Sequence, residues 1–322
     1  MRIYKIASCS KIRVAVPDAC RYIHHMGISD ILLLLGLSAI WGSSFIFIRY
    51  LAPLIGPVAT ADMRMVVAGV VLVLFFVAIR FKSDWRKNWR HFLVIGLVNS
   101  AVPFVLYSIA ALYLPAAMEA IFNSMSPMFG ALFAALWLGE KLTLRKIAGL
   151  IFGIAGVVVM SSLGNLPANP ETSLAILACL LAPMCYGLAG VYIKKRAAGV
   201  KPLAIAGGSQ LLGGLALMPF LLVSPMTVSA LSARVVMLVA VFALLCSALA
   251  YVIYYKLISD VGPTRALTVT FLIPVFAMLW GVLLIGERVT VSMAGGALII
   301  LAGTFLVTAP RRKAALKAQG AG

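Results

Sequence analysis

The sequence predicts an all-α integral membrane protein with ten transmembrane helices, arranged as two inverted five-helix repeats. Three observations predict this class: an apolar composition, a series of long apolar runs, and a similarity between the two halves of the chain. Of the 322 residues, 63% are hydrophobic and 11% are charged, whereas soluble proteins have about 45–50% and about 25%. A soluble domain of this length could not bury so much apolar surface, so we expect the lipid bilayer to be its solvent.

Ten apolar runs are long enough to cross a membrane, which takes about 20 residues in a helix. The segments between them are short and carry Gly, Pro, Ser or charge, as turns do. Pro57, Pro115 and Pro263 each stand where a run begins, which suits the first turn of a helix. The predicted spans are 29–50, 57–80, 92–113, 115–138, 144–163, 171–193, 202–223, 233–257, 263–285 and 291–309.

The basic residues are distributed unequally between the two sides of this topology. The chain has 27 Lys and Arg against 9 Asp and Glu, a net charge of +18. If the N-terminus is cytoplasmic, 23 of the 27 fall on the cytoplasmic side, which matches the positive-inside rule. The exceptions are Arg49, Arg64, Arg234 and Arg288. We therefore expect both termini in the cytoplasm and no nucleic-acid partner.

The ends of the chain differ from the apolar body. Residues 1–28 form a basic leader whose apolar stretch is too short and too charged for a signal peptide. Either translation starts at Met26, or the leader is a disordered basic arm. Residues 311–322 form a basic cytoplasmic tail. Between these ends we expect one five-helix repeat over 29–163 and a second over 171–310.

Several classes of chemistry have no support in the sequence. The five Cys form no C-x-x-C pair, and the three His lie outside the apolar runs, so no disulfide framework, metal site or cofactor is expected. The chain lacks the phosphate-binding motif of ATP-driven pumps and the motifs of common hydrolases. No nucleophile, base and orienting group occur together, so we expect no catalytic residues and no enzyme.

The two halves of the chain repeat each other at an offset of 145 to 147 residues over five spans. Because five is odd, the second copy must enter the membrane from the opposite side, as in many secondary transporters. A duplication kept for folding alone is the alternative. The matched positions include Trp41-Gly42 with Tyr186-Gly187, Arg49 with Lys194, Ser100 with Ser247, Tyr107 with Tyr254, Pro127 with Pro274, and Gly139-Glu140 with Gly286-Glu287.

These features resemble the EamA family of the drug/metabolite transporter superfamily. The resemblance rests on Ala39–Phe45 in the first span, on Ala61–Arg64 in the second, and on the proline-containing helices that end in Gly-Glu. It implies a ten-helix secondary transporter of the bacterial inner membrane that exports amino acids or other small metabolites. A channel-like facilitator is the main alternative, and a membrane enzyme or an interaction subunit is a weaker one.

Two prolines mark a place where a substrate could bind. Pro127 and Pro274 lie near the centres of the fourth and ninth spans, and a proline leaves the carbonyl four residues earlier without its helical donor. Those carbonyls belong to Asn123 and Thr270, which are repeat equivalents. Interrupted helices at corresponding positions indicate a transport site. A simple kink whose carbonyl bonds to a neighbour is the alternative.

Other polar and aromatic side chains share faces with this site. Glu119 and Asn123 are four residues apart, and Asn99 and Tyr107 lie on one face of the third span. In the eighth span Tyr251 and Tyr254 offer apolar rings with one hydroxyl each, which suits an amphiphilic ligand or, alternatively, an interface anchor. The full set of expected substrate-binding residues is Trp41, Arg64, Asn99, Tyr107, Glu119, Asn123, Gln210, Tyr251, Tyr254 and Thr270.

Charged groups inside the spans need a reason because they are costly in hydrocarbon. Arg64, whose counterpart is Gln210, is expected either to pair with Glu119 or to bind a substrate carboxylate. Glu119 is a candidate for proton uptake, since burial favours its neutral form. A structural ion pair, or side chains that extend toward the membrane surface, is the alternative for both residues.

Small residues in the fifth and tenth spans predict close helix packing. Gly149, Gly153 and Gly156 form one such face, and Gly296 and Gly303 form the other. They could pack within one chain or between two, so a homodimer is a further expectation. The remaining expected partners are a small-molecule substrate and the lipid bilayer.

Overall fold

The computed structural model describes residues 27–162, 167, 169–224 and 226–309. Apart from residues 27 and 28, the predicted basic leader and tail therefore lie outside the described residues. Within the described part the chain is helical and contains no strand. Nine of its helices are long and apolar enough to cross a membrane, and a tenth, Val269–Ile285, is shorter. The protein is an all-α membrane protein, as its composition predicts.

The first five spans follow one another along the chain with short connections. The third and fourth spans are each divided, the third by a π-helical turn and the fourth by a two-residue break. Their helices are α2 (Ile28–Ile55), α3 (Pro57–Ala78), α4 (Trp85–Gly96), η1 (Leu97–Ala101), α5 (Val102–Ala110), α6 (Ala116–Asn123), α7 (Ser126–Leu138) and α8 (Leu144–Ser162).

The second five spans repeat this order of elements. A π-helical turn again divides the third member, and a break again precedes the main helix of the fourth. Their helices are α9 (Pro170–Arg196), α10 (Pro202–Leu217), η2 (Met218–Leu222), η3 (Val228–Ala230), α11 (Ala233–Ala243), η4 (Leu244–Leu249), α12 (Ala250–Val261), α13 (Pro263–Ala266), α14 (Val269–Ile285) and α15 (Val291–Thr308).

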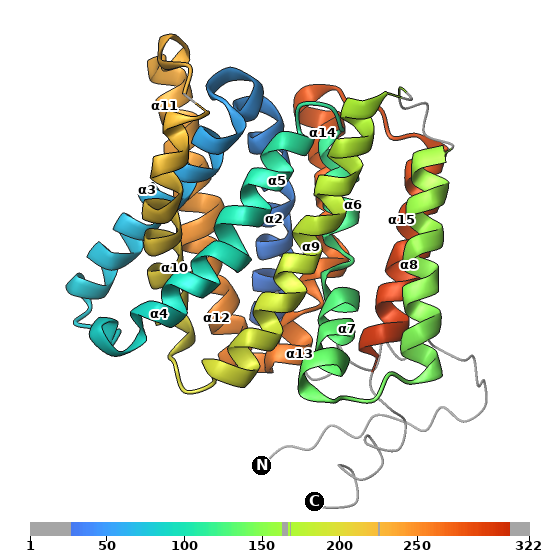
Figure 1. Ribbon diagram of the computed structural model, residues 1–322, viewed down its shortest axis with the longest axis horizontal. Coiled ribbons are helices and arrows are strands. Elements are labelled where there is room, and N and C mark those ends of the chain that lie inside the picture. Colours follow the sequence, from blue (N-terminus) through green and yellow to red (C-terminus); the bar gives the residue numbers. More distant parts are fainter. Residues whose placement is uncertain (1–26, 163–166, 168, 225, 310–322) are drawn as a thin grey trace, which may run out of the picture.

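Helix packing relates the two repeats by an approximate twofold axis. The second spans of the repeats, α3 and α10, pack on each other, and so do the fifth spans, α8 and α15. Contacts between other spans occur in matched pairs: α2 on α14 corresponds to α9 on α7, and α4 on α10 corresponds to α11 on α3. In Figure 1 the α8–α15 pair lies at one side of the bundle and α2 lies near its middle. The inverted repeat of the sequence is thus an inverted repeat in space.

Glycines allow matched helices to approach closely. A Cβ at Gly42 would lie 2.9 Å from the backbone nitrogen of Ala277, and at the equivalent Gly187 it would lie 2.6 Å from that of Gly130. Such distances are shorter than any contact a side chain could make without moving the facing backbone. The glycine face of the fifth span is used in the same way within the chain, since a Cβ at Gly149 would lie 2.6 Å from the Gly303 carbonyl oxygen.

Paired glycines also end the fourth member of each repeat. Gly139 follows α7 with φ of 70°, and Gly286 follows α14 with φ of 68°. This left-handed conformation closes a helix C-terminus and favours glycine because it has no Cβ. Each glycine is followed by a glutamate, so the repeat places one carboxylate at each end of the bundle.

The two ends of the bundle differ in charge. At the lower end in Figure 1 lie the loops 79–84, 139–143 and 197–201. Most of the described basic residues lie in these loops and in the helix turns next to them, and we call this the basic end. Contacts between these loops include Lys201 Nζ to the Lys82 carbonyl at 2.7 Å. The opposite end contains the connection between α2 and α3, residues 111–115 and residues 286–290, and we call it the Glu287 end.

Several helix boundaries differ from the prediction, and three of the differences bear on the site. The third span starts at Trp85 rather than at residue 92, because its first turns are amphipathic and polar and so escape an apolar criterion. The first helix continues through Pro53 to Ile55. In the ninth span the helical break lies at Leu267 and Thr268 rather than at Pro274, which sits inside α14.

Candidate functional site

An aromatic cluster lies where the first and third members of the two repeats meet. The ring of Trp41 on α2 lies 5.2 Å from that of Tyr254 on α12 and 6.3 Å from that of Tyr251. The equivalent pair in the other repeat is Tyr186 on α9 and Tyr107 on α5, with ring centroids 6.4 Å apart. The structure therefore brings together three of the predicted residues, Trp41, Tyr251 and Tyr254, and places Tyr107 at the matching position.

Two repeat-equivalent hydrogen bonds connect the second spans to the π-helical turns. Arg64 Nε donates to Ser247 Oγ at 2.8 Å, and Gln210 Nε2 donates to Ser100 Oγ at 3.1 Å. Gln210 also lies 3.5 Å from the Tyr251 hydroxyl, which joins this polar pair to the aromatic cluster. All of these side chains come from helix segments buried in the bundle.

Neither Ser100 nor Ser247 is among the substrate-binding residues expected from the sequence. A π-helix carries an extra residue in its turn, so the four-residue spacing that selected Asn99 does not apply within η1. Ser100 makes the contact with Gln210, and Asn99 lies half-buried beside it. The signal was present, since the two serines occupy matched positions in the repeat.

Arg64 is not paired with Glu119, contrary to one of the two expectations for it. Its guanidinium lies between two aromatic rings, 3.9 Å from the centroid of Phe104 and 4.5 Å from that of Phe242. It is also 3.4 Å from the carbonyl oxygen of Cys246. Cation–π contacts and hydrogen bonds thus hold this buried charge on the side of α3 that faces α11 and η4.

The break in the fourth span positions Asn123. Helix α6 ends at Asn123 and α7 begins at Ser126, so Pro127 stands in the first turn of a new helix. The carbonyl that the proline leaves free accepts a hydrogen bond from Ser126 Oγ at 2.6 Å. The Asn123 side chain in turn accepts one from the Tyr107 hydroxyl at 3.3 Å. Asn123 and Tyr107 therefore form one half of the candidate site.

The equivalent region of the second repeat has a different arrangement. The Thr270 hydroxyl donates a hydrogen bond to the carbonyl oxygen of Leu267, three residues earlier, at 2.8 Å. Pro274 lies one turn further along, inside a continuous helix. The structure does not join Thr270 to Tyr254 in the way that it joins Asn123 to Tyr107. The two halves of the candidate site are equivalent in sequence and unequal in structure.

Each end of the bundle carries one repeat-equivalent ion pair. At the basic end Lys194 Nζ lies 2.8 Å from Glu140 Oε1, and Lys146 Nζ lies 3.5 Å from its other oxygen. The hydrogen bond from Lys194 holds the pKa of Glu140 below its usual range. At the other end Arg49 Nε lies 3.9 Å from Glu287 Oε1. Both pairs join a first span to the end of a fourth span of the opposite repeat.

The Glu287 end contains a second, deeper carboxylate. Glu119 lies in the first turn of α6 with 0% of its surface exposed. Neither of its carboxylate oxygens has a hydrogen-bond partner among the described residues. Glu287 differs, because it accepts hydrogen bonds from the backbone N–H groups of Ala116 and Ala117 at 2.9 and 3.5 Å.

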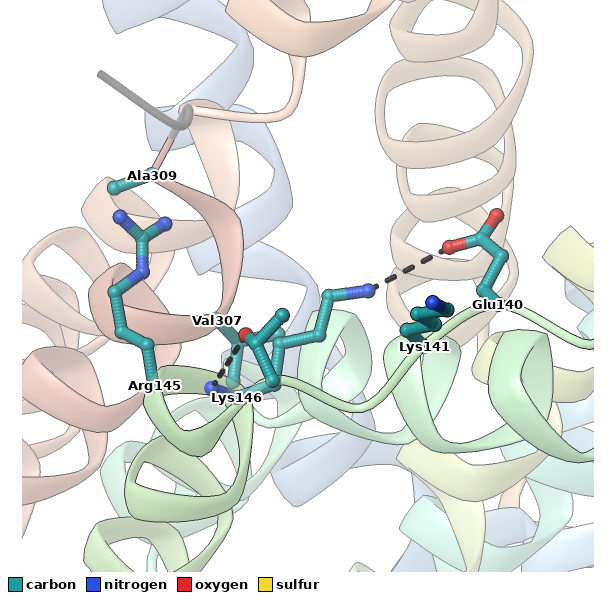
Figure 2. A pocket seen from close by; sticks show the side chains of 7 residues that line it. Glu140, Lys141, Arg145, Lys146, Val307 and Ala309 are labelled. Atoms are coloured by element: carbon teal, nitrogen blue, oxygen red, sulfur yellow. Dashed lines mark hydrogen bonds and ion pairs between the residues drawn. The ribbon is translucent and has the colours of Figure 1, made fainter. Parts of the chain in front are cut away.

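A pocket of about 370 Å³ opens at the basic end, beside the start of α8 and the end of α15. Figure 2 shows Lys146 reaching across it toward Glu140, while Arg145 points toward Ala309. None of the predicted substrate-binding residues lies in it. No group of three or more His, Cys, Asp or Glu in the described ranges could hold a metal ion. The residues lining the pocket are Glu140, Lys141, Thr143, Arg145, Lys146, Val307 and Ala309.

In the described part of the chain, ten apolar helices in two inverted repeats, with paired polar and aromatic contacts between them, are typical of a membrane transporter of the internally duplicated kind. The comparison with protein families is specific. The model of the EamA-like transporter family matches residues 28–162 and again residues 173–309. The chain belongs to this family.

Individual relatives are distant but cover nearly the whole chain. The uncharacterized transporter YvbV of Bacillus subtilis is 26% identical over 86% of this chain and 90% of its own length. Protein PecM of Dickeya dadantii is 27% identical over 83% of this chain and 88% of its own. The uncharacterized inner membrane transporter YedA of Escherichia coli is 28% identical over 80% of this chain and 83% of its own.

A solved crystal structure shares the fold. It superposes with a TM-score of 0.62 over 87% of this chain and 96% of its own, at 18% sequence identity. This likeness concerns the arrangement of the helices alone.

Proposed function

We propose that the protein is a secondary transporter of the bacterial inner membrane that exports small metabolites, such as amino acids, by alternating access. The observation that carries this proposal is that equivalent residues of the two repeats make different contacts. The Tyr107 hydroxyl donates a hydrogen bond to Asn123, for example, while the equivalent Thr270 bonds to the Leu267 carbonyl instead of to Tyr254. Two units of opposite polarity can exchange such environments, and the exchange would open first one end and then the other.

Unequal burial at the two ends supports this mechanism. Ala111 and Leu114 at the Glu287 end have 0% exposure, whereas their equivalents Ile258 and Val261 at the basic end are partly exposed. Further along the fourth spans, Ala120 is fully buried and its equivalent, Leu267, is 39% exposed. The Glu287 end is therefore the more closed one in this conformation.

The charge pattern supports the direction of transport. If the basic end faces the cytoplasm, as the positive-inside rule predicts, both termini are cytoplasmic. The more open end then faces the cytoplasm, where an exporter takes up its substrate.

The chemistry of the cluster favours an amphiphilic substrate. The rings of Trp41 and Tyr254 offer an apolar surface, while Asn123 and Gln210 offer amide groups that donate and accept hydrogen bonds. A small number of polar groups in a largely apolar setting is typical of small-molecule sites. A zwitterionic amino acid with an apolar side chain would satisfy both kinds of contact.

Counterflow in proteoliposomes tests the proposal. Vesicles are preloaded with one of a panel of unlabelled amino acids, and uptake of the same labelled compound is followed. An alternating-access transporter accelerates labelled uptake in preloaded vesicles, while a channel-like facilitator does not. Absence of counterflow across the whole panel and a wider set of small metabolites would overturn the proposal, provided that the reconstituted protein is monodisperse and inserted.

A further inference from the structure

The buried carboxyl group of Glu119 has no hydrogen-bond donor. It is fully buried in α6, and both oxygens lack a partner among the described residues. An ionised carboxylate in such a place costs several kcal/mol unless a cation or donors surround it. The group must therefore be either matched by a nearby charge or neutral.

The titratable groups around Glu119 come from four elements. Arg49 on α2 and Glu287 after α14 both interact with it electrostatically. Tyr107 on α5 and Cys179 on α9 also lie within electrostatic reach. The other helices packed on α6, namely α14 and α15, carry no titratable side chain in their sequences.

Arg49 is already occupied by other acceptors. It donates to the carbonyl oxygen of Ala111 and lies 3.9 Å from Glu287. Glu287 is thus matched by Arg49 and by the backbone N–H groups at the start of α6. The guanidinium of Arg49 thus faces the carboxyl groups of both Glu119 and Glu287, and its ion pair is with Glu287. A neutral cluster then requires a proton on Glu119.

We propose that Glu119 is a proton-binding site, and that closing the Glu287 end of the bundle takes up a proton there. When this end opens, water reaches the carboxyl group and the proton can leave. The repeat equivalent of Glu119 is Ala266, so the basic end has no corresponding site. Only the link to transport rests on the function proposed above.

Proton linkage gives the proposal a sign and a size. A conformation that binds one extra proton gains population as the pH falls, by up to about tenfold per pH unit. Acid therefore favours the closed Glu287 end, and alkaline conditions favour its opening. Glu119→Gln imitates the protonated group in shape and polarity, so it should remove this dependence while preserving the fold.

Infrared spectroscopy of the purified protein detects the proton directly. At neutral pH the wild type should show a carbonyl stretch of a protonated carboxylic acid, and Glu119→Gln should lose the part of this band that belongs to Glu119. Glu171→Gln, at an exposed position in the first turn of α9, is the matched control and should retain it. A wild-type spectrum without this band, or a band whose intensity is unchanged in Glu119→Gln, would overturn the proposal.

Thiol alkylation tests the coupling to closure. Leu114→Cys places a reporter at the closed end, in a background with the five native cysteines replaced. We measure how much the rate of its alkylation by a membrane-impermeant maleimide increases from pH 6 to pH 8. The ratio of this increase with Glu119 present to the increase in Glu119→Gln should reach up to about a hundredfold. Taking this ratio cancels the ionisation of the reporter thiol itself.

A reporter at the equivalent position of the other end separates opening from unfolding. For Val261→Cys at the basic end, the same ratio of rate changes should fall below one, because this end closes as the Glu287 end opens. A ratio that stays flat at both reporters would overturn the coupling. A positive infrared result together with absent counterflow would instead reject the transport proposal and leave the proton site standing.

Discussion

Glu140 and Glu287 occupy equivalent positions in the two repeats but accept hydrogen bonds from different kinds of donor. Glu140 accepts from the side chain of Lys194, and Glu287 accepts from the backbone N–H of Ala116. The side chain of Glu140 is 37% exposed and that of Glu287 is 14% exposed. The duplicated Gly-Glu motif thus has two roles. Glu140 forms an ion pair that solvent screens, and Glu287 forms a less exposed contact with the N-terminus of α6.

Removing the charge of Glu287 should cost more stability than removing that of Glu140. Glu287→Gln weakens a contact with a helix N-terminus and with Arg49, and we expect a loss of about 1–3 kcal/mol. Glu140→Gln removes exposed pairs with Lys194 and Lys146 and should cost at most about 1 kcal/mol. Unfolding free energies of the purified variants in mixed micelles provide the measurement. Equal losses in the two variants would contradict this asymmetry.

The contribution of Glu140 should also depend on pH. Because the hydrogen bond from Lys194 lowers its pKa in the folded protein, the pairing is complete above the ordinary carboxyl pKa. It is lost as the pH falls through the lowered value. The stability difference between wild type and Glu140→Gln should therefore be present at neutral pH and disappear in strong acid. A difference that persists in strong acid would mean that the pairing is not electrostatic.

Two glycines on α9 should respond oppositely to the same substitution. Gly187→Ala would drive a methyl group into the backbone of Gly130 and should separate α9 from α7, a loss of more than about 1 kcal/mol. Gly190→Ala meets nothing within 4 Å and should be neutral or stabilising by up to about 1 kcal/mol, since alanine favours the helix. Thermal unfolding in detergent compares the pair, and similar melting curves would show that the helices do not approach as described.

The bond between Arg64 and Ser247 should be measurable as a coupling energy. Arg64→Ala and Ser247→Ala each remove one partner of a buried, charged hydrogen bond, for which we expect a coupling of about 1.5–3 kcal/mol in a double-mutant cycle. The matched cycle of Gln210→Ala with Ser100→Ala involves neutral groups and should give about 0.5–1.5 kcal/mol. Additive effects in the first cycle would indicate that the guanidinium is held by its other contacts, the rings of Phe104 and Phe242 and the Cys246 carbonyl.

Transport should depend on both halves of the candidate site. Tyr254→Phe and Asn123→Ala remove hydrogen-bonding groups beside the aromatic cluster, and each should lower counterflow at least severalfold at normal membrane levels. Tyr113→Phe makes the same chemical change at an exposed position and should leave flux unchanged. Wild-type flux in both site variants would exclude these residues from substrate contact.

The sequence predicted the fold well because the bilayer imposes a simple requirement. Backbone groups in hydrocarbon must bond internally, so long apolar runs become helices whatever their neighbours. The offset between the halves also identified equivalent pairs such as Trp41 with Tyr186. Equivalent residues occupy equivalent places in the structure because the helices of both repeats make matched contacts, such as α2 with α14 and α9 with α7.

The details of the site were less accessible from the sequence. Apolar periodicity assumes a regular helix, so it did not detect the π-helical turns that bring Ser100 and Ser247 to their partners. The side-chain direction of Arg64 depends on Phe242, which is far away in the chain. Equivalence in sequence likewise predicted matching breaks at Pro127 and Pro274, whereas the second break lies at Leu267 and Thr268 and leaves Pro274 inside α14.

The π-helical turns have a consequence for the history of the protein. Leu97–Ala101 and Leu244–Leu249 coincide when the halves are superposed by their sequence offset. A wide turn at the same place in both copies is most simply inherited from one ancestor. Such an ancestor would be a gene for a single five-helix unit that already carried the turn, and two such units inserted in opposite directions would have built the bundle before fusion joined them.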